Sequence, residues 1–205
     1  MIRSLLFDMG NVLVHFSHQT MCRQMGVLCG RSAAEIRALL FDGGLQREFE
    51  SGRVTEEDFH HQFEQAVGQP VDIDRLREAG SDIFTLNEPM LPVLDALKRY
   101  GHRLVLLSNT SVAHFDWVRD RFDVLERFDD FVVSYQVGAV KPERAIYEAA
   151  LQQIACDPAE AFYTDDIAKY VERGHSFGLQ AEVFTDAAGL VEQLCARGID
   201  LGGAV

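Results

Sequence analysis

The sequence predicts an α/β protein in which a doubly wound parallel sheet carries a large helical insert. Two observations predict this fold class. Five short apolar runs, each four to six residues long, lie along the chain, and segments of helical length separate the last four of them. Between the first and second runs, residues 16–85 contain helical patterns and glycine-rich turns but no convincing strand.

The five apolar runs are predicted to be strands of one sheet. Their apolar residues are continuous rather than alternating, which is typical of strands buried on both faces, as in a parallel sheet. Strands that alternate with helices along the chain favour helices on both faces of that sheet. The predicted strands are Ser4–Asp8, Arg103–Ser108, Phe131–Ser134, Ala161–Asp165 and Ala181–Thr185.

Two helices are predicted between the later strands. The segment Pro89–Tyr100 has leucines at helical spacing and stops at Gly101. Pro142 suits the first turn of a second helix, because the first turn does not use the backbone N–H that proline lacks. The apolar face of this second helix consists of Ile146, Ala149, Ala150 and Ile154.

The insert is predicted to be helical throughout. Ala33–Leu40 and Glu56–Val67 have helical patterns, and Thr55 with Asp58 resembles a capping box at the start of the second of these helices. Such an insert would form a cap over the sheet. The predicted division is a Rossmann-like α/β core over residues 1–15 and 86–205 and a helical cap over residues 16–85.

Composition excludes some classes of partner. The 205 residues include 19 Lys and Arg against 32 Asp and Glu, a formal net charge of −13, which disfavours binding to nucleic acid or to an anionic membrane. No apolar run approaches the length of a membrane span. The four cysteines form no CxxC pair and are expected to be buried free thiols, so we expect a cytoplasmic protein. Both a monomer and a homodimer stay open.

Polar residues follow four of the predicted elements. Asp8 and Gly10 follow the first strand, and Ser108 and Asn109 end the second. Because the carboxyl ends of parallel strands meet at one edge of an open sheet, residues far apart in sequence can converge there. The other members of the predicted cluster are Lys141, Asp165 and Asp166.

Each member also has a purely structural interpretation. Asp8 could shape a turn, the hydroxyls after Ser108 could cap a helix, Lys141 could be a solvated loop residue, and Asp165 with Asp166 could cap the next helix. A lysine at the sheet edge would then be screened by solvent, and its removal would change stability little.

Together, the cluster suits phosphoryl transfer. Asp8 would be a carboxylate nucleophile that forms an aspartyl-phosphate. Acids on neighbouring strand ends suit a hard cation with oxygen ligands, Mg²⁺ above all. Ser108 and nearby backbone amides would hold phosphate oxygens, and Lys141 would add positive charge where negative charge develops.

These residues lie in four stretches that resemble motifs of the haloacid dehalogenase superfamily: FDMGNVLV, LLSNTS, GAVKPERAIYEAAL and FYTDDI. They occur in the family's order, and the predicted topology is similar to the branch with a helical cap after the first strand. The first motif resembles that of small bacterial sugar-phosphate phosphatases, Asp-x-Gly-Asn. The resemblance implies a Mg²⁺-dependent phosphoric monoester hydrolase that acts on a small phosphorylated metabolite.

The resemblance also implies roles for the matching residues. Asp8 corresponds to the nucleophile and a metal ligand, and Ser108 with Asn109 to the phosphate-binding pair. Lys141 corresponds to the lysine that steadies nucleophile and phosphate. Asp166 corresponds to the direct metal ligand, with Asp165 a second ligand or an outer-shell partner.

Two positions depart from the family pattern. Gly10 stands where phosphatases of the superfamily usually have a second Asp as general acid and base. Its carbonyl oxygen can still bind the metal, but the proton-transfer group is missing unless His15 or a cap residue replaces it. Aryl, acyl or anomeric phosphates would then be preferred over alkyl phosphates, because they leave more easily. Tyr170 stands where the family often has Asn or Asp.

Two other functions stay open. Haloacid dehalogenases proper also lack the second Asp, although they need no metal and carry no acidic pair such as Asp165-Asp166. The second open function is that of a weakly active or silent member of the fold that binds a ligand. The substrate is not revealed. Phe16, Phe41 and Arg47 are candidates for lining the leaving-group site, with cap core and a solvated arginine as the structural alternative.

Overall fold

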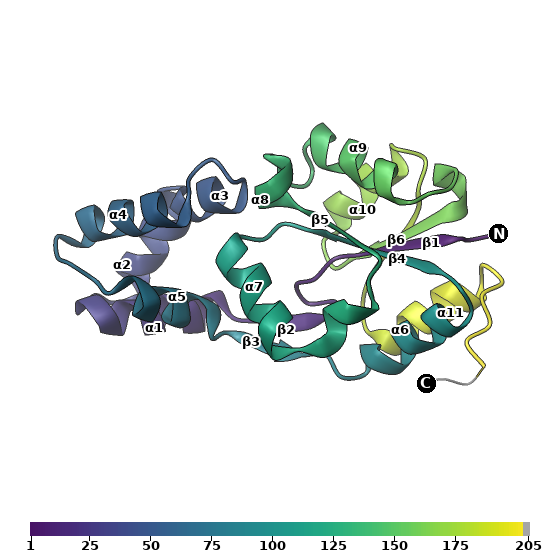
Figure 1. Cartoon of the computed structure of the whole chain (residues 1–205), viewed down its shortest axis with the longest axis horizontal. Helices are drawn as coiled ribbons and strands as arrows, with labels where there is room; N and C mark the ends of the chain where they lie inside the picture. Colours follow the sequence, from purple (N-terminus) through teal and green to yellow (C-terminus); the bar gives the residue numbers. More distant parts are fainter. Residues whose placement is uncertain (203–205) are drawn as a thin grey trace.

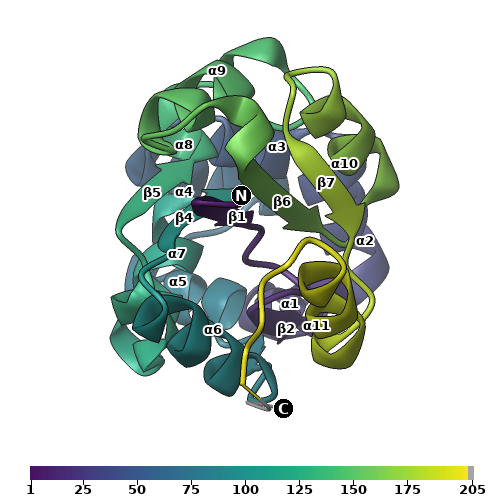
Figure 2. The same ribbon diagram turned by 90° about the vertical axis from the view of Figure 1, so that its right-hand side faces the viewer.

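A computed structural model describes residues 1–202. A five-stranded sheet with order β5-β4-β1-β6-β7 lies at its centre, and every neighbouring pair of strands is parallel (Figures 1 and 2). The strands are β1 (Ser4–Phe7), β4 (Arg103–Ser108), β5 (Asp130–Val133), β6 (Ala161–Asp165) and β7 (Gln180–Val183). The predicted α/β fold with a parallel sheet is confirmed.

Helices cover both faces of the sheet, as Figure 1 shows. On one face, Ile146 of α9 and Val171 of α10 pack in one cluster with Leu6 of β1. On the other face, Leu94 of α6 and Leu190 of α11 pack with Leu5, so the central strand is buried from both sides. These helices are α6 (Met90–Arg99), α7 (Val112–Arg121), α8 (Ser134–Val137), α9 (Arg144–Gln153), α10 (Ala168–His175) and α11 (Ala187–Cys195), with 3-10 turns at Asp123–Arg127 and Pro158–Glu160.

Between β1 and β4 lies a group of helices with an apolar core of its own, which we call the helical insert (residues 18–81; left in Figure 1). Its members are α1 (His18–Cys29), α2 (Ala33–Arg37), a π-helix (Ala38–Asp42), α3 (Leu45–Glu50), α4 (Glu56–Val67) and α5 (Ile73–Ser81). A short antiparallel pair, β2 (Val14–Phe16) and β3 (Phe84–Leu86), joins the insert to the core at both of its ends.

Several local predictions are correct and a few are wrong. Thr55 and Asp58 form the expected capping box, and α4 has the expected bounds. The strands β2 and β3 were not predicted, because each has three residues and their stability comes from pairing with each other. Pro142 does not lie in the first turn of α9: its peptide bond with Lys141 is cis, and the helix begins at Arg144.

Within residues 1–202, no helix combines the length and the apolar character that a bilayer crossing requires.

Candidate active site

The predicted residues converge at the carboxyl edge of the sheet. Asp8 follows β1, the central strand, and Asp165 ends β6, the strand beside it. Carboxylate oxygens of Asp8, Asp165 and Asp166 lie within 4.8 Å of one another. Ser108 ends β4 on the other side of β1 and is 1% exposed. The parallel register therefore places acids and a hydroxyl on either side of Asp8, as expected.

Lys141 lies at the centre of this cluster and its side chain is fully buried. Its ammonium Nζ lies 3.0 Å from Asp8 Oδ1 and 2.6 Å from Asp165 Oδ2, and it donates a hydrogen bond of 2.9 Å to the carbonyl oxygen of Leu107. The ring of Tyr170 lies 5.2 Å away, so the residue that departs from the family pattern packs against the cation. The expectation that a lysine here is screened by solvent is wrong.

The charges of the cluster shift each other's protonation. Burial disfavours the charged form of Lys141, but Asp8 and Asp165 outweigh burial and raise the pKa of Lys141 above its ordinary value. Burial also raises the pKa of Asp8 to about 7; the Lys141 ammonium opposes this shift and the Asp165 carboxylate adds to it. Lys141 therefore stays charged, whereas burial works against the ionised form of Asp8.

The two acids after β6 have different surroundings. Asp165 is fully buried, and its oxygens accept hydrogen bonds from Lys141 Nζ, from the Tyr163 hydroxyl and from the backbone N–H of Ile167. Asp166 is half-buried and accepts a bond of 2.9 Å from Asn11 Nδ2. Protein donors occupy both oxygens of Asp165. Of the two roles that the sequence left open, direct metal ligand or outer-shell partner, this favours the outer-shell partner.

Asn109 fixes the loop that carries Lys141. Its Oδ1 accepts a 2.6 Å hydrogen bond from the backbone N–H of Lys141, and its Nδ2 donates to the carbonyl oxygen of the same residue at 3.2 Å. Next to it, the backbone N–H of Thr110 donates to the hydroxyl of Ser134. Asn109 is thus engaged with the lysine loop, a contact that the sequence pattern did not predict.

Gly10 lies against an aromatic ring. A Cβ atom built at this position would lie 2.7 Å from Cε1 of Phe16, which is closer than such atoms approach in proteins. The backbone of Gly10 is outside the left-handed region, so sterics rather than backbone conformation disfavour a side chain here. The ring of Phe16 would have to shift to admit the Cβ atom of any other residue at position 10.

A small pocket, of about 40 Å³, opens in front of Gly10. Phe16 lines it, as expected, whereas Arg47 is exposed and pairs with Glu143 at 2.9 Å, which agrees with its structural interpretation. Phe41 is not among the lining residues; its ring packs against that of His18 at an interplanar angle of 51°. The lining consists of Met9, Gly10, Phe16, His18, Glu50, Phe84, Asn109, Thr110 and His114. The sequence did not single out His18, Glu50 or His114 as site residues, because only the packing of the insert on the core brings them here.

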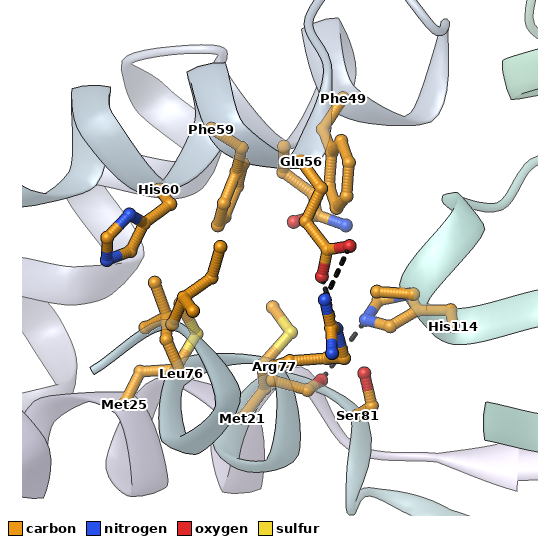
Figure 3. Close-up of a pocket in the computed structure, with 14 residues that line it drawn as sticks. Met21, Met25, Phe49, Glu56, Phe59, His60, Leu76, Arg77, Ser81 and His114 are labelled. Atoms are coloured by element: carbon orange, nitrogen blue, oxygen red, sulfur yellow. Dashed lines mark hydrogen bonds and ion pairs between the residues drawn. The ribbon is translucent and has the colours of Figure 1, made fainter. Parts of the chain in front are cut away.

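A second, small pocket, of about 30 Å³, lies between helices of the insert and the start of α7 (Figure 3). Apolar side chains point into it, among them Met21, Phe59 and Leu76. Its lining also includes the ion pair of Glu56 with Arg77, at 2.5 Å, and His114, Phe49, Met25, Gln46, His60, Ile73, Gly80, Ser81 and Ala113. Because His114 lines both pockets, the two are neighbours across one imidazole ring.

Comparison with known proteins decides the family. The model of the haloacid dehalogenase-like hydrolases matches residues 2–178. The chain belongs to this family of hydrolases. The matched range contains all four motifs that carried the resemblance, and the resemblance is confirmed.

Relatives within the haloacid dehalogenase-like hydrolases include two phosphatases. A D-ribitol-5-phosphate phosphatase of Bacteroides thetaiotaomicron is 24% identical over 189 residues, covering 88% of this chain and 90% of the relative. A sesquiterpene phosphatase of Aspergillus oryzae is 24% identical over 190 residues, covering 90% of this chain and 91% of the relative.

Solved structures agree in fold. A haloacid dehalogenase-like hydrolase of Porphyromonas gingivalis superposes with a TM-score of 0.83 at 24% identity, covering 98% of this chain and 99% of the other. A family enzyme of Bacteroides thetaiotaomicron, in complex with magnesium and inorganic phosphate, superposes with a TM-score of 0.80 at 23% identity over 91% of this chain and 96% of the other. At these identities the likeness shows the shared fold.

Proposed function

We propose that this hydrolase is a Mg²⁺-dependent phosphatase that acts on a small phosphorylated metabolite through an aspartyl-phosphate intermediate. One observation carries the proposal: a buried lysine contacts both Asp8 and Asp165, with the carboxylate of Asp166 beside them. The site thus combines a carboxylate nucleophile, a fixed positive charge and oxygen atoms that suit a metal ion.

The donor set fits magnesium. Asp8 and Asp166 offer carboxylate oxygens, and Gly10 offers a backbone carbonyl oxygen. Asp165 accepts a hydrogen bond from Lys141 and would act in the outer shell of the metal. Bound there, Mg²⁺ would neutralise phosphate oxygens and favour the ionised form of Asp8. The solved relative that holds magnesium and phosphate supports the same assignment.

The chain's own residues then act as follows. The ionised Asp8 attacks phosphorus while the ester oxygen leaves, and water later releases phosphate from the carboxyl group. Ser108 holds a phosphate oxygen, and Lys141 keeps Asp8 oriented and stabilises the charge that develops on phosphate. Asn109 holds the loop of Lys141 in position, and through it the phosphate site.

We assign the leaving group to the pocket between core and insert, and residues 16–85 to a cap domain over a core of residues 1–15 and 86–205. Glu50 and His18 from the insert line this pocket opposite Gly10 and Asn109 from the core, which supports the assignment. Polar lining groups and the D-ribitol-5-phosphate phosphatase relative favour a sugar or alditol phosphate.

One observation favours a second substrate class. The neighbouring pocket of Figure 3 is small but lined mainly by apolar side chains, and one relative is a sesquiterpene phosphatase, so a prenyl phosphate is the second candidate substrate. A dehalogenase is less well supported. Its reaction needs no metal, and the clustered carboxylates of Asp8, Asp165 and Asp166 would then have no metal to bind.

Phosphate release from a panel of sugar, alditol and prenyl phosphates tests the proposal. We expect magnesium-dependent release that a chelator abolishes and added Mg²⁺ restores, and that Asp8→Asn eliminates. Asp129→Asn is the matched control, because Asp129 pairs with Lys98 on the core surface. Full activity in the chelator would contradict the proposal and favour the dehalogenase. Magnesium binding without turnover of any ester would favour the silent ligand-binding member.

A further inference from the structure

Glu50 ends α3 of the helical insert, and two contacts fix its position. The hydroxyl of Ser134, at the start of α8 in the core, donates to the carbonyl oxygen of Glu50 at 2.5 Å. Nε2 of the buried Gln46 donates to Glu50 Oε1 at 2.9 Å. Figure 1 shows α3 directly beside α8, so the insert meets the core at this residue.

Glu50 is one of the residues that line the same pocket as Gly10, the position where the family's proton-transfer acid is missing. Among the residues within 1–202 that line this pocket, Glu50 is the one carboxylic acid. Asp8, the proposed nucleophile, is close enough for its charge to disfavour ionisation of Glu50.

The other titratable groups near the pocket are poorly suited to donate a proton. His114 Nε2 lies 3.1 Å from the carbonyl oxygen of Gly80, and burial lowers the pKa of His114 to about 4. Burial, and to a smaller extent the charge of Arg37, also lowers the pKa of His18. Both rings are therefore neutral at neutral pH. His15 is exposed on β2 and is not part of the pocket lining.

The protonation of Glu50 suits the task. Burial raises its pKa to about 7, the hydrogen bond from Gln46 opposes this shift, and the charge of Asp8 adds to it. A general acid works best when its pKa lies near the working pH, because protonated and ionised forms are then both available.

We propose that Glu50 performs the proton transfers that the chain cannot perform at position 10, an inference that rests on the proposed phosphatase function. In the first step the Asp8–phosphorus bond forms, the bond from phosphorus to the ester oxygen breaks, and the Glu50 carboxyl gives its proton to that oxygen, which leaves as an alcohol. In the second step the Glu50 carboxylate takes a proton from water, the water oxygen bonds to phosphorus, and the Asp8–phosphorus bond breaks.

This role removes the preference for easily departing groups that Gly10 alone would predict. With an acid in place, the parent protein hydrolyses alkyl and aryl phosphates at similar rates. Glu50→Gln keeps the shape of the side chain and removes the proton. We expect it to lower kcat/KM for glycerol 3-phosphate by about 10²- to 10⁴-fold and for 4-nitrophenyl phosphate by less than about tenfold, since nitrophenolate leaves without protonation.

The second step gives an independent readout. Without its base, the Glu50→Gln variant accumulates phosphorylated Asp8, seen as a burst of nitrophenol and as a phosphorylated chain in intact-mass spectra. The matched control is Glu48→Gln, on the same helix; Glu48 pairs with Arg53 at 3.0 Å and is not part of the pocket lining. It should leave both rates and the burst unchanged.

The outcomes separate this inference from the function on which it rests. If the parent hydrolyses both esters with magnesium and Glu50→Gln lowers both rates equally or not at all, Glu50 is not the proton donor although the phosphatase assignment stands. If the parent hydrolyses neither ester, both fail. Circular dichroism checks that the variant is folded, and Glu50→Asp, which keeps an acid, should retain part of the alkyl phosphate activity.

Discussion

Replacing Lys141 with methionine tests the buried charge cluster directly. The substitution keeps the unbranched side chain but removes an ammonium group that lies within 3.0 Å of two carboxylates and a carbonyl oxygen. Breaking a buried ion pair by removing one partner typically costs about 3–5 kcal/mol. Because this ammonium serves two carboxylates with no exposure of its side chain, we expect a loss at the upper end of that range, about 5 kcal/mol, at pH 8 without metal.

The loss should depend on pH in a defined direction. Even with the lysine present, burial raises the pKa of Asp8 to about 7, and without the cation it rises further. In the variant, the folded state therefore binds a proton that the unfolded state releases above about pH 4. Stability then falls as pH rises, so the deficit relative to the parent is smaller at pH 5 than at pH 8. Added Mg²⁺ should restore part of it at pH 8.

Urea unfolding followed by circular dichroism, at both pH values and with or without Mg²⁺, measures these differences. Lys169→Met is the matched control: its ammonium lies 5.0 Å from the ring of Tyr170, but the residue is exposed, so the change should stay within about 0.5 kcal/mol. A loss below about 1 kcal/mol for Lys141→Met, or one independent of pH, would refute the account of a charge cluster held by one buried cation.

Three further predictions concern single positions. Asp166→Asn should raise the Mg²⁺ concentration needed for half-maximal activity at least tenfold while the free energy of unfolding changes by less than about 1 kcal/mol, because the side chain is half-buried; an unchanged magnesium requirement would count against it as a ligand. His114 has a folded pKa of about 4, below its ordinary 6.5, so the parent should lose about 3 kcal/mol as pH falls from 6.5 to 4, and His114→Gln should show a flatter pH dependence in urea titrations. If the stability of His114→Gln fell with pH as steeply as that of the parent, His114 would not be the source of the pH dependence. Gly10→Asp alone should not raise alkyl phosphate turnover, and it should lower the free energy of unfolding by about 1–3 kcal/mol, because its Cβ meets the Phe16 ring. Adding Phe16→Ala should recover stability relative to Gly10→Asp. Increased turnover in the single variant would show that the Phe16 ring moves aside.

The sheet and the convergence of polar residues at its carboxyl edge could be predicted from sequence because their signals are local. Asp8, Ser108 and Asp165 each end a continuous apolar run, and parallel topology then brings strand ends together whatever the length of chain between them. Only the existence and direction of the strands were needed. Errors of a residue or two at strand ends left the site unchanged: the third and fifth predicted strands end one and two residues earlier than expected.

What could not be predicted depends on packing between distant elements. Arg47 and Glu50 lie three residues apart on α3, and nothing in the sequence says which of them faces the pocket. The burial of Lys141 likewise depends on the loop that Asn109 holds and on a ring from α10, that of Tyr170. The contact of Phe16 with Gly10 requires β2, a strand too short to have a pattern of its own.

The hydrogen bond between Ser134 and the main chain of Glu50 has a consequence for substrate selection. Because that bond joins α8 to α3, Glu50 keeps its place in the pocket lining only while the insert is seated on the core, and its proposed role as proton donor depends on this contact. A bulky ester that holds α3 away can still bind through its phosphate, but it meets no proton donor. Size selection then acts on turnover rather than on affinity, and an oversized ester with a poor leaving group behaves as a competitive inhibitor of the smaller substrate.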